Sequence, residues 1–201
     1  APWWRKDETV YAAEFLVRER KSVFYLPEHM IFEGQGDLVK IGSRAYCYCY
    51  GIRNIYHTRW QLEYLFPDIT KIPMRLVDSR WYHGDMCIRY LAASNTILWV
   101  PRAFDKESRK RLRDYAHFSG TNLLAAPKSL WFQETKQGIN FPMNGVGVGN
   151  IETFPWDEKI SAFPKKICEC IESGGGKVWL HNFDQFGLSG AGHRCATLIL
   201  E

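Results

Sequence analysis

Residues 37–77 read "DLVKIGSRAYCYCYGIRNIYHTRWQLEYLFPDITKIPMRLV" and change their hydrophobic period twice. The first part has the apolar content and the turn residues of strand-like runs. "HTRWQLEYLF", from His57, has the spacing of an amphipathic helix, and "KIPMRLV" returns to a strand pattern. This stretch therefore predicts strands, then a helix, then one further strand.

The same order recurs along the chain. Helical periodicity is also present at residues 7–20, 106–118 and 157–173. The four helices are followed by the short strand-like segments "SVFYL", "KIPMRLV", "TNLLAAP" and "KVWLH", and "MCIRYLAA", "TILWVP" and "RCATLIL" are further strand-like runs. A helix with about three strands, repeated about every 50 residues, predicts an internally repeated α/β fold of about four units.

The two ends of the chain interrupt this pattern. The first unit begins directly at its helix, and the chain stops shortly after Cys195, inside a predicted strand. We therefore expect residues 1–201 to form a single domain that lacks its first unit and the end of its last strand.

Composition excludes several classes of protein. The 201 residues are 46% hydrophobic and 15% aromatic, enough to form a sizeable core. The net charge of +4 is small, and the basic run "ESRKRLRDY" has acidic flanks and the pattern of a solvated helix face, so no nucleic-acid partner is expected. No apolar run approaches the ~18 residues of a membrane span, and the stretch "APWWRKDE" lacks the apolar core of a signal peptide. We expect a soluble intracellular protein, cytoplasmic or in an organellar matrix.

The six cysteines do not follow a disulfide or zinc pattern. The "CYC" and "CEC" pairs cannot easily bridge within themselves and lack the usual metal-ligand spacings. Cys47 and Cys49 share one face of a predicted strand, because side chains alternate with a period of two. Reduced thiols are expected, with these two in the core.

Three polar clusters stand beside glycines. "FEGQGD" carries Glu33 and Asp37, "WYHGDM" carries His83 and Asp85, and "SGAGHRC" ends on Cys195. Each cluster alone fits a tight turn or a core position. Taken together, a cysteine, a histidine and several carboxylates are a nucleophile, its base and the groups that orient them.

Two other loop chemistries do not fit. A phosphatase-type phosphate loop needs its cysteine several residues before the arginine, whereas here Arg194 precedes Cys195. "GGGK" at 174–177 lacks both the spaced first glycine and the Ser or Thr of a nucleotide-binding loop.

The order and spelling of the clusters resemble the guanidine-modifying, or amidinotransferase, superfamily, which includes arginine and agmatine deiminases, dimethylarginine hydrolases and arginine:glycine amidinotransferases. "EGQGD" resembles its Glu-Gly-Gly-Asp segment with one residue added, "HGD" its His-x-Asp, "SGAGHRCATL" its Gly-Gly-Gly-x-x-Cys-x-Thr and "YGIRN" its Gly-x-x-Arg-Thr. The resemblance implies a five-bladed α/β propeller of ββαβ units, with about four blades here. In many members the first blade, which we expect to be absent here, carries an aspartate that binds the guanidinium.

The resemblance also implies roles for particular residues. Cys195 would attack the guanidinium carbon, His83 would act as general acid and base, and Glu33 would orient His83. Asp85 and Asp37, and also Glu33, would bind the substrate, because planar bidentate recognition of a guanidinium requires carboxylates. Arg53 would pair with a substrate carboxylate or form a structural salt bridge. A covalent S-amidino intermediate follows, with no metal or organic cofactor.

Several alternatives stay open at this point. Water as acceptor makes a hydrolase, and a second amine makes an amidinotransferase; the spelling "HRCATLILE" favours the hydrolases. Arginine, methylated arginine and agmatine all remain candidate substrates. "SGAG" and the added residue in "EGQGD" favour a third possibility, an inactive homologue with a structural or binding role. The expected partner is a small guanidinium compound, within a homo-oligomer or larger assembly and without a membrane.

Overall fold

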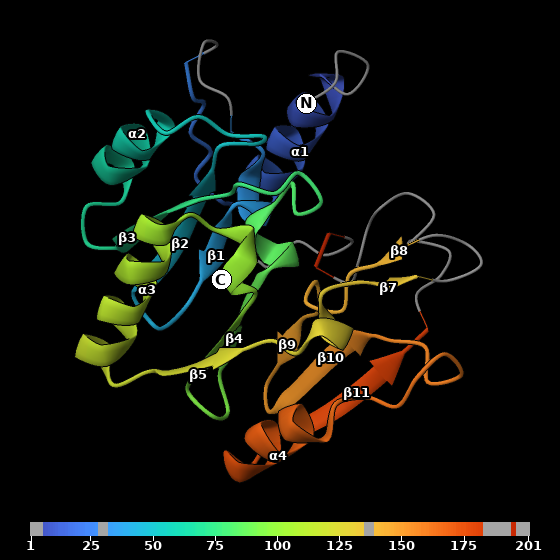
Figure 1. The fold of residues 1–201 in the computed structure, drawn as a ribbon. Helices are drawn as coiled ribbons and strands as arrows, with labels where there is room; N and C mark the ends of the chain where they lie inside the picture. The colour runs from blue at the N-terminus through green and yellow to red at the C-terminus, as the bar shows by residue number, and fades with distance from the viewer. Residues whose placement is uncertain (1–5, 28–31, 135–138, 183–193, 196–201) are drawn as a thin grey trace.

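The structure is a computed structural model that describes residues 6–27, 32–134, 139–182, 194 and 195. The predicted strand "RCATLIL" lies outside the described residues, apart from Arg194 and Cys195. Figure 1 shows the described helices and strands as three sheets with helices beside them, and a small hairpin.

The first sheet comes from the stretch at residues 37–77. It contains β1 (Leu38–Lys40), β2 (Ala45–Tyr50) and β3 (Thr70–Arg75), in that order. β1 and β2 are antiparallel, β2 and β3 are parallel, and α2 (Thr58–Leu65) connects the parallel pair. A parallel pair requires such a crossover, because a tight turn reverses the chain direction and joins only antiparallel strands.

The second sheet repeats this topology. β4 (Ile88–Leu91) and β5 (Thr96–Trp99) are antiparallel, β5 and β6 (Asn122–Ala125) are parallel, and α3 (Lys106–Ser119) connects the parallel pair. Asp105 caps α3 by accepting a hydrogen bond from the backbone N–H of Ser108.

The third sheet has the same order again. β9 (Gly147–Val148) is antiparallel to β10 (Ile151–Pro155), which is parallel to β11 (Lys177–His181), with α4 (Lys165–Ser173) between them. The mixed α/β class is confirmed, and three consecutive units share one topology. No sheet closes on itself within the part of the chain that the structure describes.

Two local predictions were wrong. α4 begins at Lys165 rather than at Asp157, because Pro164 disfavours helical backbone in the residue before it and cannot donate a helix hydrogen bond. "SVFYL" forms no strand, and Phe24 and Tyr25 are exposed. A strand needs a neighbour, and no described strand pairs with this segment.

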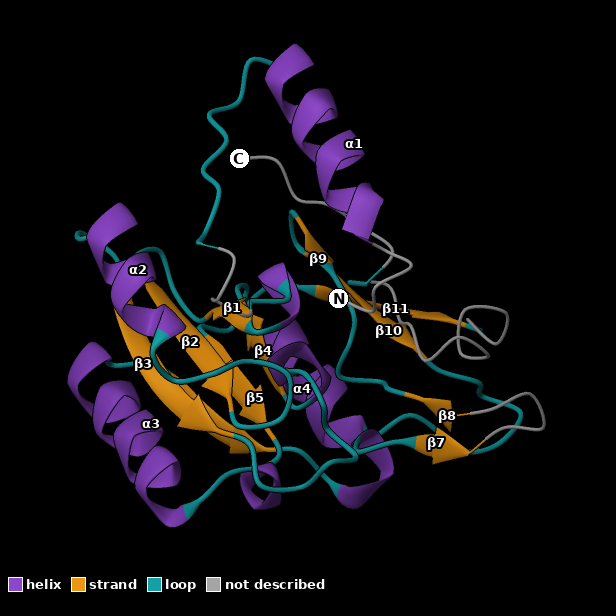
Figure 2. Ribbon diagram, turned by 90° about the horizontal axis from the view of Figure 1, so that it is seen from above, coloured by secondary structure: helices purple, strands orange, loops and turns teal. Residues whose placement is uncertain are grey.

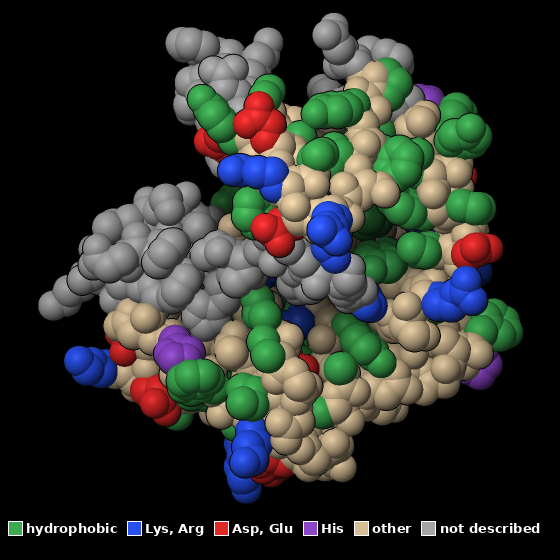
Figure 3. All heavy atoms as spheres, turned by 180° about the vertical axis from the view of Figure 1, so that it is seen from behind, with side chains coloured by type: hydrophobic (Ala, Val, Ile, Leu, Met, Phe, Trp, Pro, Cys, Tyr) green, Lys and Arg blue, Asp and Glu red, His purple; other side chains and the backbone are tan. Residues whose placement is uncertain are grey.

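The N-terminal helix contributes little to the described core. α1 (Lys6–Arg18) projects from the body of the molecule in Figure 2, and Val10, Tyr11 and Val17 are exposed. Exposed apolar side chains also gather in the upper half of the face drawn in Figure 3. Among the described residues, no helix combines the length and apolar character that a bilayer crossing requires.

The core lies between the sheets and their helices. Cys47 and Cys49 are fully buried on β2, as predicted, and all six cysteines are free thiols. Trp81, Phe104 and Trp156 are among the largest buried side chains. A short hairpin, β7 (Gln133–Glu134) with β8 (Ile139–Asn140), completes the described strands.

Candidate active site

Two short 3-10 turns bring the first two polar clusters together. η2 (Gly34–Gly36) leads into β1, and η3 (Gly84–Met86) leads into β4. The turns therefore occupy the same position in two successive units, ahead of the first strand of each, and they pack against each other. The repeat thus places "EGQGD" beside "HGD", although 46 residues separate Asp37 from His83.

Glycine is required where η3 meets the first sheet. A Cβ on Gly84 would lie 2.2 Å from the Cys49 sulfur, so any side chain there would push the turn away from β2. Gly34 has φ of +77°, in the left-handed region that glycine tolerates best.

His83 lies between two carboxylates. Its Nδ1 is 2.8 Å from Asp37 Oδ2, and its Nε2 is 3.3 Å from Glu33 Oε2. Because a carboxylate accepts hydrogen bonds, Nδ1 carries its proton and donates it to Asp37. Burial favours the neutral ring, but the hydrogen bond and charge of Asp37, with Asp85 and Glu33, outweigh burial and raise the His83 pKa.

Asp37 is enclosed by donors from the protein. Only 1% of its surface is exposed, and besides His83 it accepts hydrogen bonds from the Gly84 backbone N–H at 2.9 Å and from Asn54 Nδ2 at 2.8 Å. The sequence had suggested Asp37 as a substrate ligand. These contacts engage both of its oxygens with the protein, and its role toward the substrate stays a prediction.

Glu33 is held through its backbone and its carboxylate. Its N–H donates to Asn54 Oδ1 at 2.9 Å, and its Oε1 is 3.6 Å from an Arg53 guanidinium nitrogen. The Arg53 guanidinium also lies 5.4 Å from the centre of the Tyr82 ring. Of the two readings of Arg53, a protein salt bridge is the contact observed.

Asp85 is a second buried carboxylate of the site. Burial raises its pKa to about 7, against the opposing effects of Arg194 and His83, while the charge of Asp37 raises it further and the Asn144 side chain lowers it. Arg194 Nε lies 3.7 Å from Asp85 Oδ2. Neither Asp85 oxygen accepts a well-formed hydrogen bond from the described residues, and the ion pair that the structure shows for this carboxylate is with the Arg194 guanidinium.

The C-terminal segment brings Cys195 to this cluster. The Cys195 N–H donates to Asn144 Oδ1 and the Arg194 N–H to the Asn144 carbonyl, both at 3.2 Å. The Arg194 carbonyl accepts from Gln35 Nε2 at 3.3 Å. Cys195 is exposed, and its charge is one of those that raise the Tyr82 pKa, after burial.

The sequence did not single out Asn54, Asn144, Gln35 or Tyr82. Asn54 ends the "YGIRN" stretch quoted for Arg53, and Gln35 is the residue added in "EGQGD". Tyr82 precedes His83, whereas Asn144 stands in "PMNG", which carries no pattern that indicates a site.

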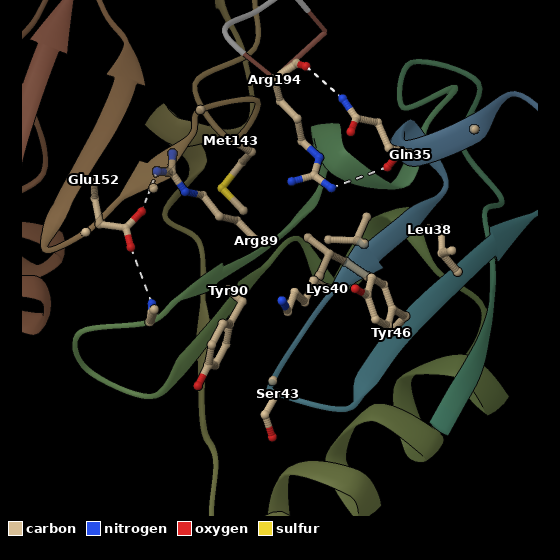
Figure 4. Close-up of a pocket in the computed structure, with 18 of the residues that line it drawn as sticks. Gln35, Leu38, Lys40, Ser43, Tyr46, Arg89, Tyr90, Met143, Glu152 and Arg194 are labelled. Carbon is tan, nitrogen blue, oxygen red and sulfur yellow. Dashed lines mark hydrogen bonds and ion pairs between the residues drawn. The ribbon is translucent and has the colours of Figure 1, made fainter. Parts of the chain in front are cut away.

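A cavity of about 790 Å³ adjoins the site without containing it. Figure 4 shows Arg194 and Gln35 on one side and the Arg89–Glu152 ion pair on another. The pair is buried, with 2.6 Å between the charged atoms. His83, Asp85 and Cys195 do not line this cavity, and Arg194 is common to it and to the Asp85 contact. No described group of His, Cys, Asp and Glu residues is arranged to hold a metal ion.

Comparison with known proteins identifies related chains. No protein-family model matches the sequence. The chain is 26% identical over 200 residues to the bifunctional arginine dihydrolase/ornithine cyclodeaminase AgrE of Nostoc sp., and 24% identical to ArgZ of Synechocystis sp.. Each match covers 96% of this chain and 25% of the relative, so the chain spans about a quarter of the length of these curated relatives.

Solved structures show the same fold. AgrE in a binary complex with L-arginine superposes with a TM-score of 0.80 at 25% identity, covering 96% of this chain and 27% of that one. DDAH from Pseudomonas aeruginosa, in complex with citrulline, shares the fold at a TM-score of 0.64 and 16% identity, covering 92% and 63% of the two chains. The resemblance to the guanidine-modifying superfamily is thereby confirmed: the chain is homologous to these arginine dihydrolases and structurally similar to DDAH.

Proposed function

We propose that this chain forms part of a hydrolase acting on arginine or an arginine derivative, with Cys195 as nucleophile and His83 as general acid and base. The observation that carries the proposal is the position of His83, held at Nδ1 by Asp37 and next to the buried carboxylate of Asp85. The Cys195 backbone is anchored to the same region through Asn144. These contacts support a single site that combines nucleophile, base and cation-binding carboxylate.

The reaction begins when the Asp85 carboxylate, which lies beside Arg194, binds the guanidinium. A guanidinium is always protonated near neutral pH, and a buried carboxylate holds it by paired, charge-assisted hydrogen bonds. The bound cation also stabilises an adjacent Cys195 thiolate. The substrate therefore helps to ionise the group that attacks it.

The thiolate then forms a bond to the central guanidinium carbon. The carbon–nitrogen bond to the departing amine breaks, and this amine takes a proton from His83, which leaves an S-amidino group on Cys195. Water gives a proton to His83 and attacks the same carbon. The carbon–sulfur bond breaks, and the thiolate is restored.

The contacts support different roles for the two carboxylates beside His83. Asp37 makes the shorter contact and is satisfied by protein donors, so it orients the ring as the third member of a triad does. Glu33 lies against Nε2, the nitrogen left to exchange protons, and is more exposed. We propose that Glu33 binds the guanidinium and contacts His83 Nε2, and that Arg53 holds Glu33 in place.

The relatives favour arginine and water as the reactants. AgrE and ArgZ are named arginine dihydrolases, and L-arginine is bound in one AgrE structure. An amine acceptor would make the same site an amidinotransferase, but these hydrolytic relatives favour water. The three ββαβ units further support a propeller of such blades. We also propose that the protein is intracellular and works within a larger assembly.

Alkylation by 2-chloroacetamidine tests this function. The reagent carries a planar cationic amidine, and it reacts when a thiolate displaces its chloride. We expect a single adduct by intact mass, absent in Cys195→Ala and retained in Cys168→Ala, which removes another partly exposed thiol. Arginine should protect against labelling. A folded wild-type chain that forms no Cys195 adduct would contradict the proposal.

A further inference from the structure

We infer that Asn144 is a positioning residue that links the backbone of the nucleophile to the carboxylate that binds the substrate. This inference deepens the proposed function and rests on it. Asn144 makes no bond to a reacting atom. Its amide contacts the Cys195 backbone at one end and faces Asp85 at the other.

The acceptor end of the amide holds the nucleophile. Asn144 Oδ1 accepts the Cys195 N–H at 3.2 Å, and the Asn144 backbone carbonyl accepts the preceding N–H of Arg194 at the same distance. Asn144 is itself fixed in a turn, because its N–H donates to the Phe141 carbonyl at 2.9 Å. Two successive backbone groups of the Cys195 segment therefore depend on one buried residue.

The donor end of the amide serves Asp85. Because Oδ1 must accept from an N–H, the other end of the side chain is the Nδ2 amino group, a donor. Nδ2 is buried, has no well-formed hydrogen bond within the described residues, and interacts with the Asp85 carboxylate, which is likewise unsatisfied. A buried donor and a buried acceptor that face each other stabilise the ionised carboxylate.

Several charged groups also act on Asp85, and Arg194 and His83 lower its pKa more than Asn144 does. Among the described residues, those that interact electrostatically with its carboxyl group are Arg194, His83, Asp37, Tyr82, Cys49 and Cys87. Arg194 and His83 favour the ionised form, whereas Asp37 opposes it. Asn144 is the neutral side chain that lowers the Asp85 pKa and also fixes the cysteine.

A pair of alkylating reagents separates this role from simple folding. 2-Chloroacetamidine needs both the Cys195 thiolate and an ionised Asp85, whereas neutral iodoacetamide needs only the thiolate. Loss of a buried amide donor that interacts with a carboxylate corresponds to about a tenfold change in an equilibrium constant. In Asn144→Ala we therefore expect the amidine-to-iodoacetamide rate ratio to fall about tenfold, and the acid limb of the amidine reaction to move to higher pH by about one unit.

Asn140→Ala is the matched control, because Asn140 is similarly buried and lies four residues earlier. Asn140→Ala should lower stability without changing the amidine-to-iodoacetamide rate ratio or the pH of the acid limb. Asn144→Ser, which is too short to reach both partners, serves in place of an alanine variant that does not fold. If a folded Asn144 variant keeps the wild-type rate ratio and the wild-type acid limb, the inference is overturned. If the wild-type protein does not react with 2-chloroacetamidine, the proposed function is overturned instead.

Discussion

His83 donates its Nδ1 proton to Asp37 across 2.8 Å, and the same carboxylate accepts the backbone N–H of the residue after His83. One buried aspartate thus fixes both the ring and the turn that carries it. Since Asp37 stands ahead of β1 and His83 ahead of β4, this contact also joins two successive units of the fold.

Replacing Asp37 by asparagine should lower the His83 pKa, because the ring loses a charged acceptor. The folded-state pKa of His83 is raised, so the stability that the contact supplies is complete below the unfolded value of 6.5 and is lost as pH rises through the folded pKa. Asp37→Asn should therefore destabilise the protein most at acid pH. His83 titration by NMR and urea unfolding at several pH values measure both effects.

Asp114→Asn is the control for that experiment, because Asp114 pairs with Lys110 on the surface. It should leave the His83 titration unchanged. A His83 pKa that does not move in Asp37→Asn would show that the charge of Asp37 has no effect on the ring.

Replacing Asp85 by asparagine should remove a pH dependence of stability. Asp85 has an unfolded pKa of 3.8 and a folded pKa of about 7. Between these values the folded state binds the extra proton, so wild-type stability falls as pH rises, by up to about 4 kcal/mol at ~1.4 kcal/mol per unit. Urea unfolding between pH 4 and pH 8 should show a shallower decline in Asp85→Asn.

Asp78→Asn provides the contrast to Asp85→Asn. The Arg80 side chain lowers the Asp78 pKa, so that carboxylate stays ionised across the whole window. Its removal should shift stability by a constant amount. Equal slopes in wild type and Asp85→Asn would refute the high pKa of Asp85.

Gly84→Ala should destabilise the fold by about 1–3 kcal/mol, the usual cost of an overpacked site. The added Cβ would lie 2.2 Å from the Cys49 sulfur, in a fully buried contact. Gly42→Ala is the control, because its Cβ would meet only the Tyr115 hydroxyl, at 3.0 Å. Thermal unfolding of the two variants should differ clearly, and similar melting temperatures would argue against tight packing at Gly84.

The Arg89–Glu152 pair joins the second and third sheets, and both side chains are buried. Arg89→Met alone should cost about 3–5 kcal/mol, because it leaves Glu152 buried without its partner. Adding Glu152→Met should recover much of that loss. Lys110→Met, which breaks an exposed pair, should cost at most about 1 kcal/mol. Additive effects of the two buried substitutions would exclude a coupled pair.

Local patterns in the sequence were enough to predict most of the described helices and strands. The order of strands and helix in residues 37–77 follows from hydrophobic periods of 2 and 3.6, and β11 coincides with "KVWLH". The two wrong predictions, the start of α4 and the strand at "SVFYL", have separate causes. Pro164 delays α4, and "SVFYL" has strand-forming side chains without a neighbouring strand among the described residues.

The chemistry of the site could be inferred from residue types, but not the assignment of each carboxylate. Cysteine, histidine and acidic residues beside glycines indicate nucleophilic catalysis, and the homology with arginine dihydrolases agrees with it. Glu33 and Asp37 look alike in "EGQGD". Only their contacts distinguish a carboxylate enclosed by His83, Asn54 and Gly84 from one that remains partly exposed.

Repetition of one local pattern was therefore sufficient to predict the α/β class, because helix and strand periods depend on neighbouring residues along the chain. The contacts of His83 with Asp37, of Arg194 with Asp85 and of Cys195 with Asn144 could not be obtained in that way. They join segments that are 46 or more residues apart. Such distances, and the burial that raises the Asp85 pKa to about 7, exist only once the units have packed together.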